Sequence, residues 1–339
     1  MSSIDLTPVS FSSLEDCAAG SDSLLALCRD FFDGRLAHAT LLTGENGVGK
    51  KTFARLLAQA LLCSGEMPEG KKPCGQCRDC KRFLAHTHPD AFFPVPAPRE
   101  KSIKIEALRE MIEALSHHSL EGGKRVIVIE NAERMTPQAQ NCLLKTLEEA
   151  SAGTYFLLTA DAEAALLPTI RSRCRVIRMQ PWAPERVEKA LLKRGIAPDR
   201  AHSLSLYCEG SLGRALQMQE DESYWAARDL VRRSFLSVRN TADIAAASAL
   251  LKDQKDQADR LLDILEQQIR ALLQCILSGA AFPADDFSAF WQNASAHSLR
   301  FILESILLSR RHRASNVGWA ALAEGLMQTI SEEASKWQV

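Results

Sequence analysis

The chain has 339 residues, of which 46% are hydrophobic, and its formal charge at pH 7 is −1. This length predicts two or three domains, and the apolar content is sufficient to fill their cores. The near-zero charge excludes a global attraction to nucleic acid or to an anionic membrane, so any contact with DNA must be local. The sequence has neither the form of a signal peptide nor an apolar run of the ~20 residues that a membrane span needs. We therefore expect a cytoplasmic protein with no membrane partner.

A glycine-rich segment lies between a predicted strand and a predicted helix. Ala39 to Thr43 is short and apolar, residues 44–50 read Gly-Glu-Asn-Gly-Val-Gly-Lys, and the next apolar residues recur at helical spacing. Glycines let successive N–H groups turn toward a phosphate, while the helix N-terminus and the lysine add positive charge. The alternative is a glycine-rich turn without a ligand. We predict a degenerate nucleotide site formed by Gly44, Gly47, Gly49, Lys50, Lys51, Thr52 and Glu130.

This loop departs from its pattern at the position that normally binds the metal. A Ser or Thr is required after the lysine because its hydroxyl coordinates Mg²⁺, but the chain has Lys51, with Thr52 one residue later. A helix turns by ~100° per residue, so Thr52 is expected to face elsewhere. Lys51 also places a cation where the metal would sit. We therefore expect ATP or ADP to bind weakly and hydrolysis to be impaired.

Four of the ten cysteines have the spacing of a metal site. Three of them form the run Cys74-Gly-Gln-Cys77-Arg-Asp-Cys80, and Cys63 lies at the predicted end of the preceding helix. In a cytosolic chain such clusters are more typical of metal ligands than of disulfides. The alternative is a set of unligated surface thiols. We predict a structural Zn²⁺ site inserted at residues 63–80, closed by four thiolates and without a catalytic role.

The middle of the chain alternates strands with helices. Arg125 to Ile129 and Tyr155 to Thr159 are short, apolar and rich in β-branched or aromatic residues, as expected of strands buried on both faces. Over residues 38–180 the alternation predicts a parallel sheet with helices on both faces. Glu130-Asn131 follows the first of these strands, where a nucleotide hydrolase keeps a metal-binding Asp and often a catalytic Glu. Glu130 is either a residual metal ligand or an ordinary polar strand end, and Asn131 cannot act as a base.

The remainder of the chain predicts helices only. Apolar residues recur at spacings of three and four from Trp182 to about residue 330. We predict three domains with boundaries at 1–181, 182–240 and 241–339. The first is the α/β domain, the second a small three-helix lid, and the third an all-helical bundle.

Several blocks together resemble the bacterial DNA polymerase III clamp-loader subunits, a family with the AAA+ fold. Within it the chain is most similar to the delta-prime type, and the gamma/tau motor subunits are near relatives. The blocks that carry this resemblance are Gly34–Ala39, the four zinc cysteines, His88–Asp90, Ala132–Met135, Asn141–Glu149 and Thr169–Cys174. The resemblance implies an AAA+ P-loop domain, a lid and a C-terminal collar within a hetero-pentamer of this chain with gamma/tau and delta subunits. That assembly would load the sliding clamp onto primed DNA.

The resemblance also assigns a role to Arg173. In this family the arginine of the Ser-Arg-Cys block projects into the ATP site of the neighbouring subunit, where a guanidinium suits the charge of a transferring phosphoryl group. The alternative is a surface arginine in a salt bridge, and Arg171 is the second candidate for the finger.

Three departures distinguish this chain from the motor subunits. Lys51 replaces the metal-binding Thr, Glu130-Asn131 replaces Asp-Glu, and Gly213 stands where a phosphate-sensing arginine is expected, with Arg214 one position later. We therefore predict a largely non-hydrolysing scaffold subunit of the DNA polymerase III complex that offers Arg173 in trans. An active gamma/tau-type ATPase is the alternative. A zinc-bearing regulator that binds nucleic acid on its own is a third possibility, which the near-neutral charge disfavours.

Overall fold

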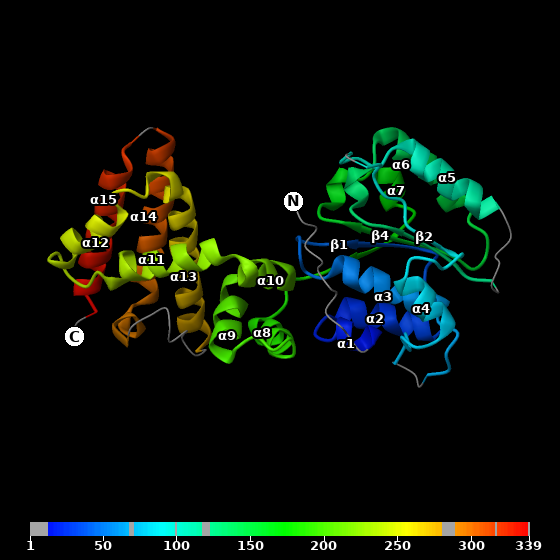
Figure 1. The fold of residues 1–339 in the computed structure, drawn as a ribbon, viewed down its shortest axis with the longest axis horizontal. Helices are drawn as coiled ribbons and strands as arrows, with labels where there is room; N and C mark the ends of the chain where they lie inside the picture. Colours follow the sequence, from blue (N-terminus) through cyan, green and yellow to red (C-terminus); the bar gives the residue numbers. More distant parts are fainter. Residues whose placement is uncertain are drawn as a thin grey trace. The chain divides into compact units, whose positions relative to one another are not determined.

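The computed structural model describes residues 13–67, 71–98, 100–116, 123–279, 289–315 and 317–337. The chain forms two compact units, shown with their elements in Figure 1. The first comprises residues 1–182 together with the short segment Ser211–Gly213, and the second comprises residues 183–210 and 214–339. None of the described helices is long and apolar enough to cross a lipid bilayer.

The first unit is built on a parallel sheet of five strands in the order β2-β3-β4-β1-β5. Their bounds are β1 Ala39–Thr43, β2 Ala91–Phe92, β3 Arg125–Ile129, β4 Thr154–Ala160 and β5 Arg175–Arg178. The register pairs Thr43 of β1 with Ala160 of β4, and Ile129 of β3 with Leu158 of β4. The carboxyl ends of β3, β4 and β1 therefore lie next to one another.

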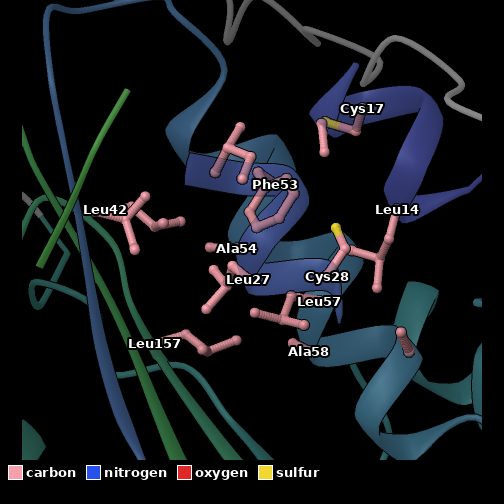
Figure 2. Close-up of a cluster of buried hydrophobic side chains, with 14 of the residues drawn as sticks. Leu14, Cys17, Leu27, Cys28, Leu42, Phe53, Ala54, Leu57, Ala58 and Leu157 are labelled. Carbon is pink, nitrogen blue, oxygen red and sulfur yellow. The ribbon is translucent and has the colours of Figure 1, made fainter. Parts of the chain in front are cut away.

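The central strands are apolar on both faces because helices cover both faces. In β1, Leu42 belongs to one buried cluster and Leu41 to another, and in β4 the neighbours Leu157 and Leu158 divide in the same way. Figure 2 shows the first cluster, in which Leu42 and Leu157 lie against Phe53 and Leu57. This alternation with a period of two is what a pleated strand imposes on its side chains.

Helices α1 to α4 contribute to the cluster on one face of the sheet and α5 to α7 to the cluster on the other, as Figure 1 also shows. Several helices begin with clear capping signals, such as Ser21 before α2 and Thr136-Pro137 at the start of α6. The bounds are α1 Leu14–Ala18, α2 Asp22–Phe32, α3 Lys50–Leu62, α4 Arg78–Leu84, α5 Ile105–Ser116, α6 Pro137–Glu148 and α7 Pro168–Arg171.

The second unit is helical throughout its described part. Helices α13 and α14 contact one another along their lengths, and α14 also packs on α15. Several apolar side chains of α13, among them Leu261, Leu265 and Leu272, are fully buried. The bounds are α8 Pro184–Leu192, α9 Pro198–Tyr207, α10 Leu212–Glu220, α11 Glu222–Arg233, α12 Asp243–Leu251, α13 Ala258–Ser278, α14 Ala296–Ala314 and α15 Trp319–Ser335.

The predicted fold class is confirmed at the level of a parallel sheet with helices on both faces followed by a helical region. Around the cysteines the structure adds a helix: α4 begins directly after Cys77, so Cys80 lies within it. The division of the helical region into a lid and a collar at residue 240 stays a prediction.

Candidate nucleotide site and metal centre

The glycine-rich loop lies at the carboxyl ends of the strands of the sheet. It connects β1 to α3, while Glu130 follows β3 and Asp161 follows β4. Because these strands are neighbours, the topology brings the loop and both carboxylates together. Parallel α/β sheets commonly bind ligands at the carboxyl ends of their strands.

Lys50, the lysine of the loop, is turned inward and almost fully enclosed. Its Nζ donates to the backbone oxygens of Gly44 and Glu45, both at 2.7 Å, and lies 2.8 Å from Oδ1 of Asp161. Only 5% of its side chain is exposed. A buried ammonium group requires such compensation because desolvation of an unpaired charge is costly. Lys50 therefore occupies the centre of its own loop.

Two cations hold the carboxylate of Glu130. Arg55 donates from Nε to Oε1 at 2.5 Å, and Nζ of Lys51 lies 4.0 Å from Oε2. Lys51 and Arg55 are four residues apart on α3 and therefore share one face of that helix. The carboxylate that would hold Mg²⁺ in a hydrolase is thus neutralised by protein side chains.

The segment Ser211–Gly213 contacts the backbone of the loop. The Ser211 hydroxyl donates to the backbone oxygen of Asn46 at 3.0 Å, and the Gly213 N–H donates to that of Gly47 at 3.1 Å. A Cβ at Gly213 would lie 3.0 Å from the Gly47 Cα, so a larger residue would force this contact apart. The close approach of the two backbone segments therefore requires glycine at position 213.

Two of the loop glycines are required by their backbone surroundings. Gly44 has φ +145°, and a Cβ there would lie 2.4 Å from the backbone oxygen of Met179. Gly49 precedes α3 in the left-handed region with φ 99°, which a residue with a Cβ adopts at a cost. Asn131 also has positive φ, 51°, and its N–H donates to the Thr159 hydroxyl at 3.0 Å.

Asp161, Arg55 and Ser211 are part of the site, although the sequence did not single them out. Asp161 could have been found from the sequence, because it directly follows a buried strand as Glu130 does. Arg55 could also have been found, because it lies one helical turn after Lys51. Ser211 lies two residues before Gly213, but nothing in the sequence indicated its partner Asn46, which is 165 residues away.

Arg173 lies between α7 and β5 and is paired within the chain. Its Nη1 donates to the Thr169 backbone oxygen at 3.0 Å and its Nη2 to the carboxylate of Glu148 at the end of α6. The salt bridge that the sequence left as an alternative is therefore present. About a third of the Arg173 side chain remains exposed. Arg171 is 3.8 Å from a carboxylate oxygen of Glu163.

The four predicted metal ligands converge. The sulfur atoms of Cys63, Cys74, Cys77 and Cys80 all lie within 4.8 Å of one another, and those of Cys74 and Cys80 are 3.8 Å apart. A tetrahedral zinc ion with bonds of about 2.3 Å separates its sulfur ligands by about 3.8 Å. Cys63 ends α3, while Cys77 and Cys80 lie at the start of α4, so two helices fix the ligand positions.

Backbone N–H groups point at these sulfur atoms. The N–H of Cys74 donates to the sulfur of Cys63 at 3.4 Å, and those of Cys77 and Cys80 donate at 3.3 Å to the sulfurs of Cys74 and Cys77. Hydrogen bonds from the N–H groups of Cys77 and Gln76 lower the pKa of the Cys74 thiol. Such bonds stabilise thiolates, which are the ligand form that a metal binds. The donor set fits a structural metal ion.

Comparison with known proteins shows similarity to subunits of DNA polymerase III. Residues 22–183 match the family model described as DNA polymerase III, delta subunit. The DNA polymerase III subunit delta' of Haemophilus influenzae is 40% identical over 44% of this chain and 45% of its own length. That of Escherichia coli K12 is 36% identical over 58% of each chain. The DNA polymerase III subunit gamma of Buchnera aphidicola subsp. Schizaphis graminum is 26% identical over 93% of this chain and 83% of its own length.

The delta' matches span about half the length of those relatives. The family match covers the sheet, the glycine-rich loop and the cysteine cluster, since it runs from α2 to just beyond β5. Over residues 22–183, the chain is therefore similar to DNA polymerase III delta-prime subunits.

Proposed function

We propose that the chain is a delta-prime-type subunit of the DNA polymerase III clamp loader. In this role it is a largely non-hydrolysing scaffold that assembles with gamma/tau and delta subunits and helps to load the sliding clamp onto primed DNA. Its similarity to delta' subunits in the first unit and the gamma-type relative that matches most of its length support this assignment. The strand–loop–helix unit and the parallel sheet of the first unit favour the AAA+ architecture of those subunits.

The main evidence that this chain hydrolyses ATP poorly is the pairing of Glu130 with cations of the protein. Arg55 already donates to its carboxylate and Lys51 lies 4.0 Å away, so a Mg²⁺ ion would have to compete with two cations for it. Asn131, at the position expected for a general base, cannot accept a proton from water, and loss of such a base typically lowers a rate by about 10² to 10⁴. The enclosed Lys50 and the Gly213 contact further oppose entry of a nucleotide.

Arg173 is the proposed contribution of this chain to catalysis. It is partly exposed beside the C-terminus of α6, and its guanidinium has five donors, of which Thr169 and Glu148 engage only a part. A guanidinium delivered to the nucleotide of a neighbouring motor subunit would stabilise the charge of the transferring phosphoryl group, an effect worth about 10³ to 10⁵ in rate. We propose Arg171 only as a secondary candidate.

We propose Zn²⁺ as the ion of the four-cysteine site. Four thiolates and no open position are typical of structural zinc, and the ion would link the end of α3 to the start of α4. Its contribution is to local folding, because no ligand position remains for a reacting water.

The decisive experiment is steady-state ATP hydrolysis by the purified chain, alone and mixed with gamma/tau and delta subunits, clamp and primed DNA. We expect negligible turnover by the chain alone. In the mixture, Arg173→Ala is expected to lower turnover by at least about tenfold while the complex still assembles, because one stabilising charge is lost.

Arg178→Ala is the matched control, since Arg178 is also exposed, lies on the adjacent strand β5 and pairs with Glu163. We expect it to leave turnover unchanged. Robust Mg²⁺-dependent turnover by the isolated chain that disappears in Lys50→Ala would replace this proposal with a gamma/tau-type ATPase. Equal turnover of the wild-type and Arg173→Ala mixtures would remove the role in trans.

A further inference from the structure

A small cavity lies between α9 and α11 in the second unit. Its volume is about 320 Å³. It is lined by Ala197, Asp199, Arg200, Ser203, Trp225 and Arg228. Arginine, serine and tryptophan side chains dominate this wall, and the cavity is separate in sequence from the phosphate loop, from Arg173 and from the cysteines.

The ring of Trp225 holds two guanidinium groups. The Cζ atom of Arg200 lies 4.1 Å from the ring centroid and that of Arg228 lies 4.7 Å from it. Arg228 is also 5.8 Å from the ring of Tyr207. Both pairs with Trp225 are within the range of cation–π attraction, which offsets part of the repulsion between the two like charges. Two permanent positive charges are therefore fixed side by side at the cavity.

Two buried hydrogen-bond donors at this cavity have no acceptor among the described residues. Arg200 donates from Nη2 to the Gln219 backbone oxygen at 3.2 Å, and Arg228 donates from Nη2 to the Ser203 hydroxyl at 3.3 Å. The Nε of Arg200 and the Nε1 of Trp225 are buried without a hydrogen-bond partner among the described residues. Leaving buried donors unsatisfied is costly, and both groups can only donate. The missing partner must therefore be an acceptor.

We propose that this cavity binds a phosphate group. Two fixed guanidinium groups select an anion, and the donors of two arginines and an indole come from different side chains, which suits a tetrahedral group better than a planar carboxylate. The volume admits one phosphate with part of an ester. Asp199 is the acidic residue in the lining and is exposed, so its carboxylate weakens the binding. The phosphate is either free or part of a nucleic-acid backbone.

The test is a nuclear magnetic resonance titration of the full-length chain. The chain has five tryptophans, so the indole signal that is missing in Trp225→Phe belongs to Trp225. We expect sodium phosphate to shift this signal and the Nε–H signal of Arg200 in a saturable way, whereas sodium chloride at equal ionic strength does not. The same titration with a thymidine decanucleotide assigns the source. Tighter, salt-sensitive binding of the oligonucleotide indicates a nucleic-acid backbone, and saturation by inorganic phosphate alone indicates a free ion.

Three substitutions distinguish a binding site from a structural stack. Arg200→Gln is expected to weaken phosphate binding by at least about tenfold, because it removes a charged hydrogen-bond donor. Asp199→Asn is expected to strengthen binding several-fold, an increase that a merely structural role would not produce. Arg233→Gln is the control, since Arg233 lies on α11 but pairs with Asp229 and does not line the cavity.

Two results would overturn the proposal. One is that phosphate and chloride produce the same shifts in the wild-type chain. The other is that polyglutamate saturates the Trp225 signal while phosphate and the oligonucleotide do not, which would identify an acidic protein segment as the ligand instead.

Discussion

At the phosphate loop, single side chains determine the electrostatics of the whole site. Lys51 stands where a hydroxyl would bind the metal, and with Arg55 it neutralises Glu130. Asp161 compensates the charge of Lys50. Each charge of the site is therefore paired within the protein, and an incoming Mg²⁺–nucleotide would have to compete with these pairs rather than with water.

This pairing predicts the effect of restoring the metal position. In the double variant Lys51→Thr, Arg55→Ala, a hydroxyl replaces one cation and Glu130 becomes free to bind Mg²⁺. We expect ATP affinity, measured by calorimetric titration, to rise by about tenfold or more in the presence of Mg²⁺ and to change little in its absence.

Arg29→Ala provides the control for a generic loss of positive charge, because Arg29 lies in the last turn of α2 and not on α3. If the wild-type chain binds Mg²⁺–ATP as tightly as the double variant does, the ion pairs of Glu130 do not limit nucleotide binding.

At the scale of elements, capping residues determine where helices begin and how they are linked. Asp221 caps α11 by accepting from the Tyr224 N–H at 2.9 Å, and its other carboxylate oxygen accepts from Arg260 of α13 at 2.7 Å. One side chain therefore both starts a helix and connects it to the long helix of the same unit. The hydroxyl of Ser223, together with the Tyr224 N–H and Arg260, lowers the pKa of Asp221 against the opposing effect of burial.

This shift predicts a pH-dependent contribution to the free energy of unfolding. Because the folded-state pKa is lowered, the contribution of Asp221 is fully present above its unfolded pKa of about 3.9 and is lost as the pH falls through the folded value. Asp221→Ala is expected to lower the free energy of unfolding at pH 7 by about 1 kcal/mol, the usual effect of losing a cap.

Asp221→Asn separates the two roles, since Asn also caps helices but cannot form the ion pair with Arg260. Urea unfolding at pH 7 and pH 3 measures the differences. The difference in the free energy of unfolding between the wild-type chain and the Asn variant should be smaller at pH 3 than at pH 7. An equal difference at both pH values would contradict the role of the Asp221 charge.

At the scale of the whole molecule, the two units have separate cores. The sheet packs between its two helical clusters in the first unit, and α13, α14 and α15 bury their own apolar faces in the second. The cysteine cluster belongs to the first unit, where it also lies near α1 through the hydrogen bond from the Leu14 N–H to the Lys72 oxygen at 3.0 Å.

This organisation predicts two unfolding transitions, of which only one responds to metal removal. Chelation under reducing conditions, or Cys77→Ser, is expected to lower the Tm of the first unit by at least about 5 °C, because structural metal binding contributes directly to folding. Differential scanning calorimetry measures both transitions. Tryptophan fluorescence identifies the second, since four of the five tryptophans (Trp225, Trp291, Trp319 and Trp337) lie in that unit.

The control is Cys142→Ser, a half-buried cysteine of the first unit outside the cluster. A shift of both transitions on chelation, or of neither, would contradict a structural metal confined to the first unit.

The sequence by itself determined the features that depend on local patterns. The glycine spacing of residues 44–50 predicts the loop, the apolar runs of β3 and β4 predict buried strands, and the spacing of Cys74, Cys77 and Cys80 predicts a metal site. These features can be predicted from the sequence because each depends on only a few neighbouring residues, whose propensity and periodicity determine the local structure.

Only the tertiary structure decided which charges and donors meet. Arg55 reaches Glu130 across 75 residues of sequence, Ser211 reaches Asn46 across 165, and Arg200 and Trp225 come together only when α9 packs near α11. No period or motif encodes such pairs, because they depend on how the sheet order and the helix packing bring distant segments into contact. The sequence therefore predicts a nucleotide site at this loop, and the packing of distant side chains determines that the charges there are already paired.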